Sequence, residues 1–175
     1  SSSSGSGSST IPNTAPQLAS ISGLAFSDTS GDDSFSNETG TLTGSDADTG
    51  DTLTYAISGQ SADNSRPGFT QSEAGTYGTL YIDSASGAYE YVPNDSAIEG
   101  ASSTQTDSFT LSVSDGTANA TQGLTVTING VDDVPTLASP GGISLTDTPN
   151  NDIFTVASAT MSVTERDTGD TITHG

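Results

Sequence analysis

The chain has no cysteine, no tryptophan and no lysine, and its two arginines stand against 22 acidic residues. Without cysteine, disulfides cannot stabilise the fold. The formal charge of −20 repels the phosphates of nucleic acid and the anionic headgroups of lipids, so we expect neither as a partner. No apolar run approaches the roughly 20 residues of a membrane-spanning helix, so membrane insertion is not expected.

Residues suited to catalysis are equally scarce. His174 is the only histidine and aligns with Tyr55 in the repeat described below, so an ordinary strand residue is the simpler interpretation. No phosphate loop and no dinucleotide fingerprint occurs. The aspartates that could form a glycosidase pair lie in turns or linkers. We therefore expect that the protein is not an enzyme.

An internal repeat organises the chain. Residues 15–56 and 134–175 align without a gap at an offset of 119, with 16 identities in 42 positions. The chain thus holds one whole repeat and the opening third of a second, which indicates a tandem array and a surface structure. We predict a Ser/Gly-rich linker over 1–14, a β-sandwich repeat over 15–130, an acidic interdomain linker over 131–135, and the N-terminal part of a second repeat over 136–175.

The complete repeat reads as short strands separated by turn residues. The run Ser108–Ser114 alternates strictly, with Phe109, Leu111 and Val113 on one face, and the run 123–128 does the same. Further strands are expected at 24–26, 41–43 and 52–57, and in a hairpin that joins 80–82 to 89–91 through 83–87. A helical period is absent, apart from a turn near 96–100.

About seven strands with one apolar face each must bury those faces against one another. The sequence therefore predicts an all-β fold, a Greek-key β-sandwich of two antiparallel sheets. A β-solenoid is less suitable, because its repeats are far shorter than the 119 residues found here.

The most informative chemistry lies in an acidic turn. Asp46, Asp48 and Asp51 fall within six residues around Gly50, so their carboxylates can surround one hard cation and repel one another without it. An EF-hand is rejected, because its distal glutamate and flanking helices are missing. A solvated acidic surface and simple turn preference remain alternatives. The second copy favours the metal interpretation, since it keeps Glu165, Asp167 and Asp170.

These motifs resemble a known family. The run 46–55 is similar to the DxDxG…Y segment of cadherins, and the runs 91–95 and 109–116 and the linker 131–135 complete the pattern. Over residues 15–175 the chain resembles the VCBS and cadherin-like repeats of giant bacterial RTX adhesins. The resemblance implies a cadherin- or immunoglobulin-like sandwich in a large secreted protein of the bacterial cell surface, with roles in adhesion and biofilm.

The resemblance also implies Ca²⁺ at the junctions between neighbouring repeats, which would turn the array into a stiff filament. Asp132 and Asp133 would be linker ligands, and Glu38 and Asp95 would come from the preceding repeat. The full set of expected metal ligands is Glu38, Asp46, Asp48, Asp51, Asp95, Asp132, Asp133, Glu165, Asp167 and Asp170. The upstream linker carries Asn13 and Thr14 where the downstream one has its two aspartates, so the upstream site is expected to be weaker or incomplete.

The sequence is also compatible with two alternative functions. A lectin-like module would bind polysaccharide of a biofilm matrix through the segment 60–77, which carries Phe69 and Tyr77. A self-complementing fibre would pair the strand edges of residues 134–175 with another copy of the chain. The expected partners are accordingly neighbouring repeats of the same or identical chains, with polysaccharide as the alternative.

Overall fold

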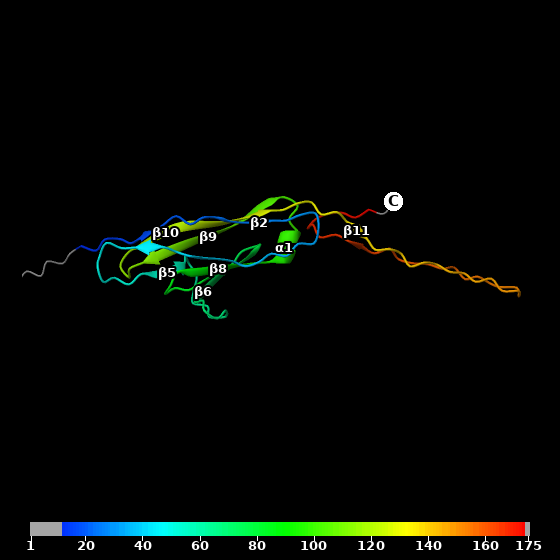
Figure 1. The fold of residues 1–175 in the computed structure, drawn as a ribbon, viewed down its shortest axis with the longest axis horizontal. Coiled ribbons are helices and arrows are strands. Elements are labelled where there is room, and N and C mark those ends of the chain that lie inside the picture. The colour runs from blue at the N-terminus through cyan, green and yellow to red at the C-terminus, as the bar shows by residue number, and fades with distance from the viewer. Residues whose placement is uncertain (1–11, 174–175) are drawn as a thin grey trace, which may run out of the picture.

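The computed structural model describes residues 12–173; residues 1–11 of the predicted linker and His174 lie outside this range. The regular secondary structure of the described chain is almost entirely β (Figure 1). Its one helix, α1, is five residues long, too short to cross a bilayer. The elements are β1 Gln17–Leu18, β2 Leu24–Ser27, β3 Glu38–Thr41, β4 Gly44–Ser45, β5 Thr54–Ile57, β6 Gln71–Ala74, β7 Gly78–Ile82, β8 Ala88–Pro93, α1 Asp95–Glu99, β9 Thr104–Ser114, β10 Asn119–Asn129, β11 Thr136–Leu137 and β12 Val163–Thr164.

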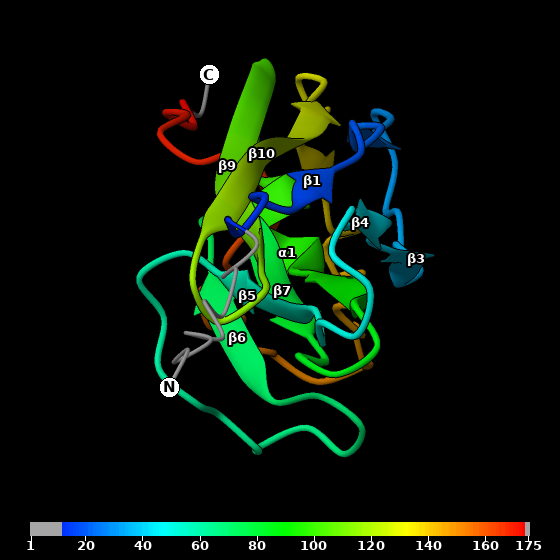
Figure 2. The ribbon, with the colours of Figure 1, turned by 90° about the vertical axis from the view of Figure 1, so that its left-hand side faces the viewer.

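Two four-stranded sheets enclose the core (Figure 2). One sheet has the strand order β2-β10-β9-β5, and the other has the order β3-β8-β7-β6. β2 runs parallel to β10, whereas all other neighbours within these two sheets are antiparallel. Two small pairings, β1 with β4 and β11 with β12, complete the described strands. The arrangement confirms the predicted all-β sandwich, but the expectation of two purely antiparallel sheets was wrong, because β2 lies parallel to β10.

The inner faces of both sheets supply the core. In β9 the side chains of Phe109, Leu111 and Val113 are buried and the residues between them are more exposed, as the alternation predicts. Each aliphatic side chain buried in this way stabilises the fold by about 1.5–3 kcal/mol relative to exposure. The other strands add Phe26, Ile57, Leu80, Ile82, Tyr89, Tyr91, Leu124, Val126 and Ile128.

One carboxylate lies inside the sandwich. Asp107 of β9 is buried and accepts a hydrogen bond from the Tyr91 hydroxyl at 2.9 Å. The backbone N–H groups of Thr76 and Tyr77 donate to the same carboxylate, each at 2.9 Å. Burial, assisted by the bond to Asp107, raises the pKa of Tyr91. A Cβ at Gly75 would collide with the Asp107 carboxylate, so glycine allows the β6–β7 turn to close on β9.

The turns follow the sequence prediction in part. The expected hairpin through 83–87 is formed by β7 and β8, and the turn expected near 96–100 is helix α1. The prediction of a strand over 41–43 was wrong. β3 ends at Thr41 because Leu42 turns into the core, 3% exposed, while its N–H bonds to the Gly87 carbonyl at 2.9 Å. Two-residue strands such as β1 and β4 carry no alternation, so a count of about seven strands missed them.

The second copy repeats the local structure of the first. β11 and β12 pair in the register of β1 and β4, shifted by 119 residues, so that Leu137 faces Val163 as Leu18 faces Gly44. The Thr148 N–H donates to Asp152 at 2.5 Å, as the N–H of its counterpart Thr29 does to Asp33 at 2.7 Å. Both copies therefore adopt the same local backbone.

The two copies differ in how deeply their apolar side chains are buried. Leu145 is 61% exposed where its counterpart Phe26 is 5% exposed, and Met161 is 49% exposed where Leu42 is 3% exposed. Residues 138–162 extend away from the sandwich as two stretches of chain side by side (Figure 1). The apolar side chains of the second copy thus occupy the sequence positions of core residues in the first copy. No second sheet covers them among the described residues.

Candidate metal sites at the ends of the repeat

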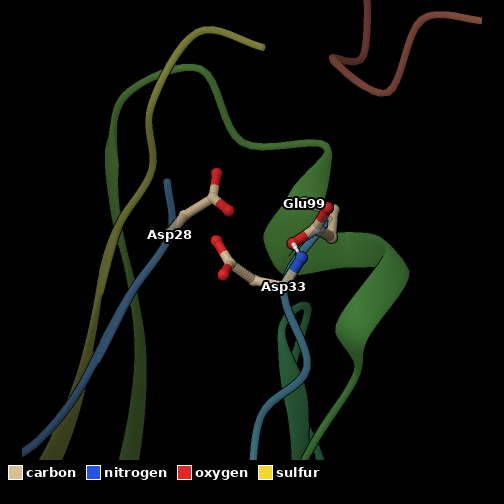
Figure 3. A group of neighbouring side chains, drawn as sticks. All are labelled: Asp28, Asp33 and Glu99. Atoms are coloured by element: carbon tan, nitrogen blue, oxygen red, sulfur yellow. Dashed lines mark hydrogen bonds between the residues drawn. The ribbon is translucent and has the colours of Figure 1, made fainter. Parts of the chain in front are cut away.

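Three carboxylates meet where β2 and α1 end. Asp28 follows β2 directly, Asp33 lies in the loop after it, and Glu99 is the last residue of α1. One oxygen of each lies within 4.8 Å of the other two (Figure 3). The Asp33 backbone N–H donates to Glu99 Oε1 at 2.9 Å, which fixes the loop against the helix. These three residues are called the sandwich group below.

A second group of carboxylates comes from the linker and from the turn after β12. Asp132, Asp167 and Asp170 also bring one oxygen each within 4.8 Å of one another. The Asp167 N–H donates to Glu165 Oε1 at 3.1 Å, and Gly169, at a φ of 104°, allows the tight backbone between Asp167 and Asp170. These three residues are called the linker group below.

Asp133 and Arg166 connect the two groups. The Asp133 N–H donates to the Asp167 carboxylate. The Arg166 guanidinium lies 3.8 Å from Asp133 Oδ2 and 3.6 Å from Glu99 Oε2. The Thr168 N–H donates to the Gly100 carbonyl at 3.1 Å. The turn of the second copy therefore contacts the end of the first sandwich, and the two groups with Asp133 form one acidic junction.

The carboxylates of the junction are partly buried and repel one another, and too little positive charge lies nearby to offset this. Burial, reinforced by the charge of Asp28, raises the pKa of the Glu99 carboxyl. Burial and the charges of Asp28 and Asp167 raise the pKa of Asp133, although Arg166 acts in the opposite direction. Partial desolvation and the charge of Asp132 raise the pKa of Asp170. These carboxylates would be better accommodated by a cation.

Several buried oxygens at the junction also lack a hydrogen-bond donor. Both Asp133 carboxylate oxygens are unpartnered, although the side chain is only 1% exposed. A buried polar atom without a partner carries its full desolvation penalty, so such atoms normally have an explanation. A hard cation that takes oxygen ligands supplies one. The other unpartnered oxygens of the junction are Asp28 Oδ1, Glu99 Oε2, Glu165 Oε2 and Asp167 Oδ1.

The opposite end of the sandwich carries a related but poorer group. Asp46 and Asp51 converge with Asp115, from the turn between β9 and β10. The Thr14 N–H donates to Asp48 Oδ2 at 2.6 Å, in the position of the bond from Asp133 to Asp167. The Asn13 side chain donates to Asp115 Oδ2 at 3.0 Å. This end therefore has the backbone geometry of the junction but none of its linker carboxylates.

Most residues expected to bind metal lie in or beside these groups. Glu38 is exposed at the start of β3, and Asp95 accepts a bond from the Phe35 N–H at 3.2 Å. Neither belongs to a converging group among the described residues. The remaining eight do converge or are bonded to a member: Asp46, Asp48, Asp51, Asp132, Asp133, Glu165, Asp167 and Asp170.

Sequence reasoning missed Asp28, Asp33, Glu99 and Asp115. The identity of Asp28 and Asp33 with Asp147 and Asp152 in the second copy was a usable signal. No local pattern marks Glu99, which reaches the junction only because α1 caps that end of the sandwich.

The segment proposed for polysaccharide binding does not place its two aromatic residues together. The Phe69 ring packs against Tyr81 with centroids 6.0 Å apart, and the Arg66 guanidinium lies 5.2 Å from the centre of the Tyr81 ring. Arg66 also pairs with Glu90 at 2.6 Å. Tyr77 packs instead against the core cluster. Phe69 and Tyr81 therefore form the aromatic surface, and Tyr77 is separate from it.

The fold defines a β-sandwich repeat that carries a group of carboxylates at each end. The model of the bacterial cadherin-like domain family matches residues 13–130, which span the whole first sandwich. The chain therefore belongs to the bacterial cadherin-like domain family, whose members are structural and adhesive modules. No curated protein was found to match it.

Proposed function

We propose that this chain is a structural and adhesive segment of a large extracellular bacterial surface protein of the RTX-adhesin type. In this proposal Ca²⁺ bound at the junction fixes each repeat against the next. The observation that carries the proposal is the set of buried carboxylate oxygens without donors between Asp28, Glu99, Asp133 and Asp167. An adhesive stalk needs defined angles between repeats rather than a catalytic group, so no enzymatic activity is assigned.

The chemistry of the donors favours calcium over transition metals. All candidate ligands are carboxylates, and the junction offers no thiol and no imidazole among the described residues. Asp28 and Glu99 belong to the first repeat, whereas Asp133 and Asp167 belong to the linker and the second. An ion shared by both sets would therefore resist bending of the linker.

The affinity expected of such a site suits an extracellular location. Calcium sites of extracellular modules bind at about 10⁻⁴ to 10⁻³ M, so they would be empty inside a cell and filled outside it. The acidic repeats would then repel one another and stay loose before export, and stiffen after it. The formal charge of −20 makes this change in repulsion large.

The order of the junction can be measured directly. The chain has no cysteine, so Thr110→Cys on β9 and Thr164→Cys on β12, both at exposed positions, give a clean pair of spin labels across the junction. The distance distribution should narrow in millimolar Ca²⁺ and broaden with a chelator. The same pair in Asp133→Asn should stay broad in both conditions. A distribution equally wide with and without Ca²⁺ in the unaltered junction contradicts the proposal.

We further propose that residues 134–173 are completed by strands equivalent to β5–β10, supplied by the same or an identical chain. The support is the exposure of Leu145 and Met161, whose counterparts are core residues. If an identical chain supplies the strands, sedimentation should show association at high protein concentration. Leu145→Asp should abolish association, and the neighbouring Thr146→Asp should not. A monomer at every concentration contradicts completion by an identical chain.

Polysaccharide binding is the second candidate function. It is supported by the pairing of Phe69 with Tyr81 beside Arg66 and Glu90, because aromatic faces next to charged groups are common features of sugar sites. Binding to a glycan array that disappears in Phe69→Ala and persists in Tyr77→Phe would support it. Absence of binding in the unaltered chain would contradict it.

A further inference from the structure

We infer that Arg166 is a tethered cation of the junction: it holds the two repeats together when calcium is absent and opposes calcium when it binds. The inference rests on the proposed calcium site, and it concerns what this chain's own guanidinium does there.

The position of Arg166 is unusual within the repeat. In the acidic turn of the first copy the corresponding residue is Ala47, which is exposed and carries no charge. The chain has one other arginine, Arg66, on the outer face of the second sheet. The positive charge at the junction is therefore specific to the second copy and to this connection.

The guanidinium faces carboxylates from three separate segments. Arg166 Nε lies 3.7 Å from Asp32 Oδ1 in the loop after β2, and 3.6 Å from Glu99 Oε2 at the end of α1. Its Nη1 lies 3.8 Å from Asp133 Oδ2 in the linker. Arg166 itself belongs to the turn after β12. One side chain of the second repeat thus faces carboxylates of the first repeat and of the linker between them.

The same contacts are too long for hydrogen bonds. Each of the three distances exceeds 3.5 Å, and Glu99 Oε2 and Asp133 Oδ2 remain without a donor. The Arg166 side chain is 30% exposed. It lines an open cavity together with Asp33 and Asp95. The guanidinium therefore supplies charge without filling the ligand positions, and it has room to swing toward solvent.

A divalent ion and a guanidinium at the same carboxylates repel each other. Arginine stays protonated at every physiological pH, so the competition cannot be relieved by proton loss. Calcium must displace the side chain or bind beside it, and in both cases the positive charge weakens binding. In return, the junction without calcium is less repulsive than the carboxylates alone would make it. Arg166 thus raises the calcium concentration at which the junction stiffens and limits how far it loosens below that concentration.

Arg166→Ala tests both halves of this inference, and Arg66→Ala is the matched control because it removes the same charge away from the junction. By titration calorimetry, Arg166→Ala should bind Ca²⁺ at the junction roughly three- to tenfold more tightly than the unaltered chain. Arg166→Lys should remain near the unaltered chain, and so should Arg66→Ala. With a chelator present, the label pair on β9 and β12 should give a broader distance distribution in Arg166→Ala alone.

The two readouts separate failure of this inference from failure of the calcium site. Absence of calcium binding in every variant, Arg166→Ala included, overturns the proposed site, and the chelated distance distribution then still decides the tether. Calcium binding that Arg166→Ala leaves unchanged or weakens overturns the competition. An unchanged distribution in the chelated Arg166→Ala protein overturns the tether.

Discussion

The backbone N–H of Asp133 donates a hydrogen bond to the carboxylate of Asp167, 34 residues further along the chain. The same bond joins Thr14 to Asp48 across the same separation in the first copy. In both copies the linker is thus held against the acidic turn of the repeat that follows it. The difference is the side chain at the linker, since Asp133 adds a carboxylate and Thr14 adds none.

This relationship predicts that the upstream end can be converted into a stronger site. Asn13→Asp with Thr14→Asp restores the two linker carboxylates while leaving the bond from residue 14 to Asp48 in place. Calorimetry should show a gain in calcium binding by the double variant, without a change in the junction site. Ser20→Asp, at an exposed position away from the group, controls for added charge. No gain over this control would contradict the role assigned to the linker aspartates.

Glu99 and Glu38 should differ as metal ligands. Glu99 is 5% exposed and has an unpartnered oxygen at the junction, whereas Glu38 is exposed and lies outside the converging groups. Glu99→Gln should raise the melting temperature in chelator, since it removes a repelled buried charge, and should diminish the rise that Ca²⁺ produces. Glu38→Gln should change neither value. Equal effects of the two substitutions in thermal unfolding would contradict the geometry of the site.

The raised pKa values of Glu99 and Asp133 predict an unusual pH dependence. Because the folded protein takes up protons on these groups more readily than the unfolded chain, their contribution to the free energy of unfolding in chelator should rise as the pH falls from neutral toward the ordinary pKa of a carboxyl, about 4. With Ca²⁺ bound, protons compete with the ion, so stability should fall over the same range. Urea unfolding at several pH values checks both signs. The rise in chelator should be smaller in Glu99→Gln.

The buried pair of Tyr91 and Asp107 predicts two different losses of stability. Tyr91→Phe removes one donor and leaves the carboxylate bonded to two backbone N–H groups, so it should lower the free energy of unfolding by about 1–2 kcal/mol. Asp107→Ala leaves three donors without their acceptor, the buried Tyr91 hydroxyl among them, so it should cost more, about 2–4 kcal/mol. Urea titration measures both. A loss in Asp107→Ala no larger than that in Tyr91→Phe would contradict the described network.

The sequence predicted those parts of the molecule whose signals are local. The alternation of Phe109, Leu111 and Val113 in one strand was sufficient to place β9 in a half-buried sheet, and a short acidic turn was sufficient to mark Asp167. The resemblance to cadherins then implied that Asp132 and Asp133 of the linker lie beside that turn.

Residues that meet only through the fold could not be predicted in this way. Glu99 and Asp28 are 71 positions apart, and they converge because β2 lies parallel to β10 while α1 covers the same end. The repeat marks Asp28, which recurs as Asp147, but nothing in the sequence around Glu99 marks it as the partner of Asp28. The contact of Arg166 with Glu99 could not be predicted for the same reason, because it depends on the path of the linker and not on the residues next to Arg166 in the sequence.

The central claim is that the junction between the two repeats is a calcium site, and titration calorimetry of Ca²⁺ against Mg²⁺ at fixed ionic strength tests it most directly. The account predicts calcium-specific binding at about 10⁻⁴ to 10⁻³ M that is lost when Glu99→Gln and Asp133→Asn are combined. Binding that Mg²⁺ reproduces, or that the double variant retains in full, would show that the acidic junction is only a solvated, negatively charged surface.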